Sequence, residues 1–314
     1  MSCVNVFQLV MRRGRFMEIT GNSIEIQSGR EAIVSPQATS APAELPTLMH
    51  RLRWYAQTTH ADRIAFTMIL DQDWNDIELS YRELDCRARA IAARLQSLDA
   101  PGQPVLIVHD PGMDYVASLF GCMYAGAIAV PVYPPSMLKL QHTLGRLQAI
   151  IQNAGARVML SSREIIGDAL SPLWNLDASA AIAVDELSLS EAVDWRETSP
   201  SPRDLALLQY TSGSTGVPRG VALTHANLMH NLRALVRHYH FPVQRSHWLP
   251  LPRRWHGIDY GFLLPTYEGV ETVILAPKDS SPTRSAGCKQ SIATKEPATE
   301  ARISVMNCAS ERST

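Results

Sequence analysis

The chain has 314 residues, a formal net charge of -1 at pH 7 and 46% hydrophobic residues. This length suits one large domain or two small ones, and the apolar content is typical of globular rather than disordered proteins. A charge near zero gives no general attraction to nucleic acid or anionic membranes. No apolar run reaches the roughly 20 residues that a membrane-spanning helix needs. We therefore expect a globular protein with no membrane span and no nucleic-acid partner.

The five cysteines, at positions 3, 86, 122, 288 and 308, form neither a metal-binding spacing nor a paired framework. Scattered cysteines of this kind are typical of reduced thiols, so we expect a cytoplasmic protein.

Residues 1–46 form a poorly patterned N-terminal segment that ends in a linker. The stretch from Ser35 to Pro46 is rich in Pro, Ala and Ser, which is typical of linkers. Arg12 and Arg13 follow a short apolar run instead of preceding it, the wrong order for a secretory signal. Met17 is an alternative start.

The pattern becomes regular after this segment. A helix is expected through Leu48, Leu52 and Tyr55, followed by strands over residues 64–70 and 77–81 with an acidic turn between them. Ser80 and Glu83 then form a capping-box pattern. The helix that they open places four apolar residues on one face, namely Leu84, Ala88, Ile91 and Leu95.

Strands and helices then alternate. Strands are expected over residues 105–108, 127–130 (ended by Pro131, Pro134 and Pro135), 158–160 and 181–184. Helices are expected through Tyr115, Leu119 and Met123 and through Leu140, Leu144, Leu147 and Ile151. This alternation argues for a doubly wound α/β sheet, in which ligands lie beyond the carboxyl ends of the strands.

The most specific stretch is Tyr210-Thr-Ser-Gly-Ser-Thr-Gly-Val-Pro-Arg-Gly220, between the apolar runs 205–209 and 221–223. Glycines at 213, 216 and 220 allow tight turns and close approach of a ligand to the backbone. The hydroxyls and backbone N–H groups of such a loop bind anions, and Arg219 adds a charge that suits phosphate. The spacing is not that of a Walker loop. The alternative is a polar turn between two strands, but the order of hydroxyls, glycines, proline and cation favours polyphosphate binding.

This stretch resembles the phosphate-binding signature of the adenylate-forming superfamily, whose usual Pro-Lys-Gly ending is Pro-Arg-Gly here. Other segments resemble fatty acyl-AMP ligases in particular. They are Pro111-Gly-Met-Asp-Tyr115, Phe120-Gly-Cys-Met-Tyr-Ala-Gly-Ala-Ile-Ala-Val-Pro-Val-Tyr-Pro-Pro135, Thr224-His-Ala-Asn-Leu-Met-His-Asn231 and Trp248-Leu-Pro-Leu251. The resemblance covers roughly Leu48 to Asp279 and implies mixed sheets flanked by helices.

The resemblance implies an enzyme that uses ATP and Mg²⁺ to convert a fatty acid into acyl-AMP. The acyl group would then pass to an acyl carrier protein or a polyketide synthase carrier domain. By resemblance, the phosphate-binding residues are Thr211, Ser212, Gly213, Ser214, Thr215, Gly216, Arg219 and Gly220. We assign no catalytic residue and no metal ligand. Two alternatives stay open, a long-chain acyl-CoA synthetase fragment and a non-catalytic nucleotide-binding remnant.

A helix is expected to open at Thr224 as N-cap. Four histidines stand at 225, 230, 238 and 240. Their spacing places only His225 near the loop, so surface or capping roles are favoured over a metal site.

The chain departs from the family pattern at Pro252-Arg-Arg-Trp-His-Gly-Ile258, where relatives carry a His-Asp-Met-Gly-Leu segment that lines the acyl pocket. Either the pocket entrance is altered or the sequence is locally corrupted.

Residues 280–314 contain no Leu, Phe, Tyr or Trp, although 21 aromatic residues precede them. One interpretation is a disordered tail. The genetic code offers another. New codons can be formed from the third base of each codon and the first two bases of the next, with the third bases chosen freely. Read in this way from the third base of the Asp279 codon, the gene can encode FIAHPVRWLQAINRYKGTRNGG, and from the third base of the Ala301 codon it can encode THLRYELCVRA. These peptides resemble the continuation in acyl-AMP ligases. We therefore interpret residues 47–279 as a partial AMP-binding domain and 280–314 as an unstructured tail that follows a one-base frameshift near Asp279.

This interpretation implies that the adenine-binding segment, the acidic Mg²⁺ ligand, the ribose-binding aspartate and the C-terminal lysine of the family are not encoded in this frame. We then expect an inactive fragment in which strands such as Val273-Ile-Leu275 lack a partner.

Overall fold

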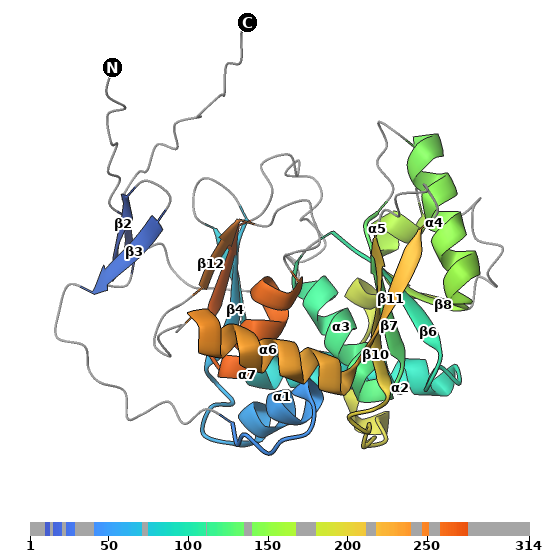
Figure 1. Ribbon diagram of the computed structural model, residues 1–314, viewed down its shortest axis with the longest axis horizontal. Helices are drawn as coiled ribbons and strands as arrows, with labels where there is room; N and C mark the ends of the chain where they lie inside the picture. The colour runs from blue at the N-terminus through green and yellow to red at the C-terminus, as the bar shows by residue number, and fades with distance from the viewer. Residues whose placement is uncertain are drawn as a thin grey trace, which may run out of the picture.

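The computed structural model describes residues 10–12, 15–20, 23–28, 41–70, 75–110, 112–134, 140–167, 180–211, 218–239, 247–250 and 258–275. Within these ranges, two mixed β-sheets are separated and flanked by helices (Figure 1). The α/β fold with mixed sheets that the sequence predicts is therefore confirmed.

The larger sheet has the strand order β11-β10-β7-β6-β8-β9. Its strands are β6 (Pro104–Val108), β7 (Ile128–Val132), β8 (Val158–Ser161), β9 (Ala181–Ala183), β10 (Leu205–Thr211) and β11 (Arg219–Thr224). All neighbours run parallel except β11, which pairs antiparallel with β10 at the edge.

The smaller sheet has the order β12-β13-β4-β5. Its strands are β4 (Ile64–Ile69), β5 (Asp76–Ser80), β12 (His247–Pro250) and β13 (Thr272–Leu275). The expectation that residues 273–275 lack a partner is wrong, because β13 pairs in parallel with β12 on one side and β4 on the other. The pairing of β13 with β4 joins residues such as Thr272 and Phe66, which are far apart in sequence, so a local pattern cannot assign it.

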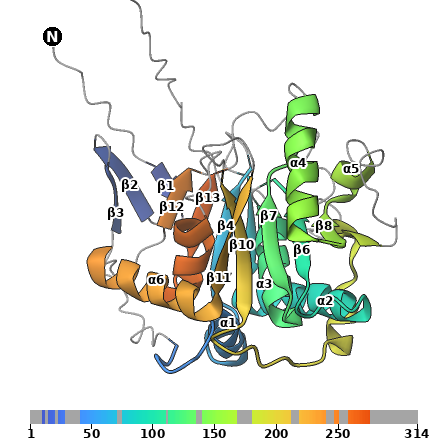
Figure 2. The same cartoon turned by 45° about the vertical axis from the view of Figure 1, so that its right-hand side comes forward.

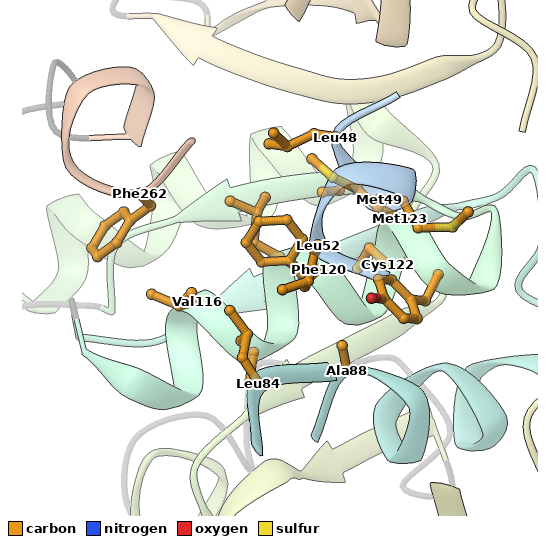
Figure 3. Packing of buried hydrophobic residues seen from close by; sticks show 14 of the residues in the cluster. Leu48, Met49, Leu52, Leu84, Ala88, Val116, Phe120, Cys122, Met123 and Phe262 are labelled. Carbon is orange, nitrogen blue, oxygen red and sulfur yellow. The ribbon is translucent and has the colours of Figure 1, made fainter. Parts of the chain in front are cut away.

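The main core lies between the two sheets. It is built on α1 (Leu48–Gln57), α2 (Tyr81–Ser97) and α3 (Met113–Ala125), with Ile258–Leu263 and α7 (Leu264–Glu268). Their apolar side chains point toward one another in Figure 3, including Leu52, Leu84 and Phe120. The predicted capping box of α2 is confirmed, because the Glu83 carboxylate accepts from the Ser80 N–H at 2.8 Å while the Glu83 N–H donates to Ser80 Oγ at 3.2 Å.

A second core covers the other face of the larger sheet, beneath α4 (Leu140–Ala154). Strand β6 is buried on both faces. Val105 and Ile107 belong to the main core, whereas Leu106 and Val108 belong to the second core. Successive side chains of a strand point to opposite faces, so an uninterrupted apolar run is the sequence of a strand buried on both sides.

Strand β7 is longer than the sequence predicts, because it continues through Pro131 to Val132 instead of ending at the proline. Because β10 pairs with β7 only at Ala129, the strand has no ladder partner on one side at Pro131, where a missing N–H is tolerated.

The N-terminal segment also contains three antiparallel strands, β1 (Val10–Arg12), β2 (Arg15–Thr20) and β3 (Ser23–Ser28). The sequence analysis missed them. The Gly21-Asn22 pair between alternating apolar residues was the available hairpin signal.

The remaining described elements are short, apart from α6 (His225–Tyr239). They are α5 (Arg163–Ile165) and the 3-10 turns Val184–Glu186 and Leu189–Asp194. Helix α6 packs against α1, α7 and β11 and is drawn in orange in Figure 2.

Candidate functional site

The predicted phosphate loop connects β10 to β11 at the edge of the larger sheet. Thr211 and Arg219 form the last pair of the antiparallel ladder. The loop therefore starts at the carboxyl end of β10, where a ligand of an α/β sheet is expected. Ser212, Gly213, Ser214, Thr215 and Gly216 lie outside the described residues, whereas Arg219 and Gly220 open β11.

The base of this hairpin is held by Tyr210, which is 1% exposed. Its hydroxyl donates a 2.6 Å hydrogen bond to Asn153 Oδ1, at the end of α4. Burial raises the pKa of Tyr210, so the hydroxyl stays protonated and available as a donor. Gly220 is the direct cross-strand partner of Tyr210. The end of β10 is thus tied to α4 and to β11 at once.

Arg219 is exposed at the first position of β11. No carboxylate among the described residues lies within ion-pair distance of it. A guanidinium that is not already neutralised can bind a phosphate in a bidentate manner.

Two further side chains lie at the same edge, because β6, β7 and β10 are parallel and their carboxyl ends meet there. Tyr133 follows β7 and is 38% exposed. His109 follows β6 and is buried, with its Nε2 3.1 Å from Ser118 Oγ on α3. Burial lowers the pKa of His109 to about 4, so this ring is neutral at pH 7. The sequence analysis missed both residues, since a lone His or Tyr after an apolar run carries no motif.

His225 does not lie near the loop, contrary to the expectation from its spacing. It follows β11 at the end that pairs with the start of β10, roughly 20 Å along the strand from Arg219. There it is buried and lines a cavity of about 490 Å³ with Asp204 and Thr198. Burial lowers the pKa of His225 to about 4. His225 is close to the loop in sequence but not in space, because β11 runs away from the loop toward the start of β10.

Thr224 caps α6 as expected. Its Oγ1 accepts from the Asn227 N–H at 3.2 Å, and its own N–H donates to Asn227 Oδ1 at 3.0 Å. Of the other histidines, His230 is exposed, whereas the side chains of His238 and His240 lie outside the described part. Within the described ranges, no three His, Cys, Asp or Glu side chains are grouped so that they could hold a metal ion.

The arrangement therefore offers binding chemistry rather than bond-breaking chemistry in its described part. Among the described residues, the guanidinium of Arg219 is exposed at the end of the hairpin. The buried, neutral His109 follows β6 at the same edge of the sheet. The altered segment 252–258 and residues 280–314 both lie outside the described ranges. None of the helices in those ranges has the length and apolar character needed to cross a bilayer.

Comparison with known proteins places these features in a family. Residues 52–299 match the model of the AMP-binding enzyme family. The chain is 32% identical over 244 residues to the medium-chain-fatty-acid--[acyl-carrier-protein] ligase JamA of Moorena producens, a match that covers 74% of this chain and 40% of that protein. It is 34% identical over 190 residues to the long-chain-fatty-acid--AMP ligase FadD32 of Mycolicibacterium smegmatis, with 58% of this chain and 29% of the relative covered.

Among solved structures, a fatty acyl-adenylate ligase from Legionella pneumophila, crystallised with acyl adenylate and pyrophosphate, is similar with a TM-score of 0.68 and 32% identity. The match covers 74% of this chain and 40% of that one. The chain thus spans about 40% of the length of such relatives. The match to the family model over most of the chain and the shared fold agree, and the chain belongs to the AMP-binding, adenylate-forming enzyme family, with fatty acyl-AMP ligases among its similar relatives.

Proposed function

We propose that this chain is part of a ligase that activates a fatty acid with ATP and delivers the acyl group to a carrier-protein thiol. A carboxylate oxygen of the acid attacks the α-phosphorus of ATP, the bond to the β-phosphate oxygen breaks, and acyl-AMP and pyrophosphate form. The thiol then displaces AMP from the acyl carbon. The observation that carries the proposal is the hydroxyl- and glycine-rich connection at the carboxyl end of β10.

The loop's role in this proposal is to hold the leaving pyrophosphate. Thr211, Ser212, Ser214 and Thr215 would donate hydrogen bonds to the β- and γ-phosphates, and Arg219 would neutralise charge that builds up on them. Gly213, Gly216 and Gly220 would shape the loop. Mg²⁺ bound with ATP would neutralise further phosphate charge. We assign no protein ligand for Mg²⁺.

Pyrophosphate exchange tests activity directly. We propose that the 314-residue polypeptide alone gives no ATP–pyrophosphate exchange with fatty acids, because the residues matched to relatives cover about 40% of their length. Exchange above a no-acid control would contradict this. ATP binding without exchange is the expected result, and absence of ATP binding would remove the role given to the loop.

The coding DNA tests the frameshift. Inserting one base near codon 279 should open a long frame that contains the Arg-Trp-Leu and Arg-Tyr-Lys segments. If no single-base change does so, the frameshift hypothesis fails. In a frame-restored enzyme, a holo carrier protein should accept the acyl group and CoA should not. The opposite preference would favour an acyl-CoA synthetase.

A further inference from the structure

The close approach of Tyr210 to Gly220 gives this glycine a role inside the protein. A Cβ built on Gly220 would lie 2.9 Å from Tyr210 Cζ and 3.2 Å from both Cε2 and Oη. The 2.9 Å distance is shorter than the contacts that real Cβ atoms make, and the 3.2 Å distances are tighter than most of them, so the end of the ring lies against the Gly220 backbone. The contact is made by the protein alone and involves no ligand.

Tyr210 cannot easily move aside. Its ring belongs to the second core, which also contains Leu147 and Ile150 of α4. Its hydroxyl is held by Asn153 at 2.6 Å. An alanine at position 220 would therefore have to push β11 away from β10, because well-packed cores resist added methyl groups.

We infer that Gly220 is required by Tyr210 rather than by the ligand, and that Tyr210, held by Asn153, is a positioning residue for Arg219. Because Arg219 directly precedes Gly220 and faces Thr211 across the ladder, any displacement of β11 at position 220 moves the guanidinium. The expected effect on nucleotide binding rests on the proposed function, whereas the packing role of Gly220 does not.

A ligand-free measurement tests the contact itself. Trypsin cleaves after Arg219 only when the end of the hairpin opens, so the cleavage rate there reports local opening. Gly220→Ala should raise this rate about tenfold. In a Tyr210→Leu background, which has no ring over position 220, the same substitution should change the rate less than twofold. Alanine at position 220, directly after the cleaved bond, could itself change the rate at which trypsin cuts. Comparing the two backgrounds cancels this effect.

Two further variants complete the design. Asn153→Ala removes an exposed helix residue, so the protein should fold and show a roughly threefold faster cleavage after Arg219. Gly145→Ala, in α4 with no atom within 4 Å of the added Cβ, is the matched glycine control and should leave the rate unchanged.

The ligand arm measures the Kd of ATP and of inorganic tripolyphosphate for the same variants. In the native background, Gly220→Ala should weaken the binding of both ATP and tripolyphosphate. In the Tyr210→Leu background, the same substitution should have little effect on either Kd. An equal effect of Gly220→Ala in the two backgrounds, or weaker binding without faster ligand-free cleavage, would overturn the inference in favour of a direct ligand role. If the unmodified chain binds neither probe, the proposed function fails while the cleavage cycle still decides the role of Gly220.

Discussion

Asp85 is a buried carboxylate with three partners among the described residues. It accepts hydrogen bonds from the Tyr124 hydroxyl at 2.9 Å and from Arg89 Nε at 2.8 Å, and Arg53 lies 3.5 Å away. These partners come from α1, α2 and α3, so one buried charge joins the three helices between the sheets. Removing the charge takes away the carboxylate that Arg89 and Arg53 share, although Arg53 keeps Glu197 at 3.8 Å.

Asp85→Asn should therefore destabilise the fold by about 2 kcal/mol, within the range for hydrogen bonds to charged groups. Urea unfolding followed by tryptophan fluorescence measures it, because Trp195 packs on Tyr124 with ring centroids 5.3 Å apart. Asp62→Asn is the matched control, since its pair with Arg82 is exposed and should contribute nothing measurable. Equal effects of the two substitutions would contradict the role given to Asp85.

Arg219 carries the residue-scale prediction for binding. Arg219→Ala should weaken ATP binding about tenfold or more, as expected for loss of a charged hydrogen-bonding partner, while Arg219→Lys should retain most of the affinity. Isothermal titration of the purified chain measures both. Because Arg219 is exposed, thermal stability should not change. Arg203→Ala, an exposed arginine before the opposite end of the hairpin, should bind ATP normally, and a loss there equal to that of Arg219→Ala would argue for a general charge effect.

At the scale of elements, the packing of α2 on α3 depends on Gly121. A Cβ at this position would lie 2.5 Å from Ile91 Cγ2, so the two helices approach as closely as a glycine allows. Helix propensity alone would favour alanine here by up to about 1 kcal/mol. The contact opposes that gain.

Gly121→Ala should destabilise the protein by roughly 1–3 kcal/mol despite its better helix propensity. Gly145→Ala should instead stabilise it by about 0.5–1 kcal/mol, because α4 has open space around position 145. The two midpoints of urea unfolding should therefore move in opposite directions. A shift of both midpoints to higher urea concentration would show that propensity, rather than interhelical packing, decides the outcome.

At the scale of the whole molecule, the buried histidines His109 and His225 make stability depend on pH. Burial lowers the pKa of both His109 and His225 to about 4, whereas the unfolded chain has His pKa values near 6.5. Between these values the unfolded state binds protons that the folded state does not. The stability contributed by each neutral histidine is thus fully present above about pH 6.5 and is lost as the pH falls toward 4.

Each histidine should account for a loss of roughly 3 kcal/mol over that full range. His109→Gln or His225→Gln should make the free energy of unfolding fall less steeply between pH 7 and 5 than in the unmodified chain. Burial raises the pKa of Asp114 and Glu268, which acts in the opposite direction. The difference between variant and parent isolates the histidine, and parallel pH profiles would contradict the assignment.

Much of the fold could be predicted because the signals are local. The capping box at Ser80 and Glu83, the apolar runs of β6 and β8, and the strand–loop–strand context of residues 205–223 all follow from side chains within a few positions of one another. The hydroxyl and glycine order of the loop also indicated the family, because such a spacing is specific by itself.

Tertiary structure alone decided the features that join distant parts of the chain. It placed β13 between β12 and β4, moved His225 to the far end of the hairpin, and gathered Arg53 and Tyr124 around Asp85. The sequence by itself determined most of the strands and helices between residues 48 and 239, since backbone periodicity is short-range, and its loop chemistry predicts a phosphate site after β10. Why Gly220 is a glycine was decided only by packing, because the ring that excludes a side chain there reaches it across the strand ladder.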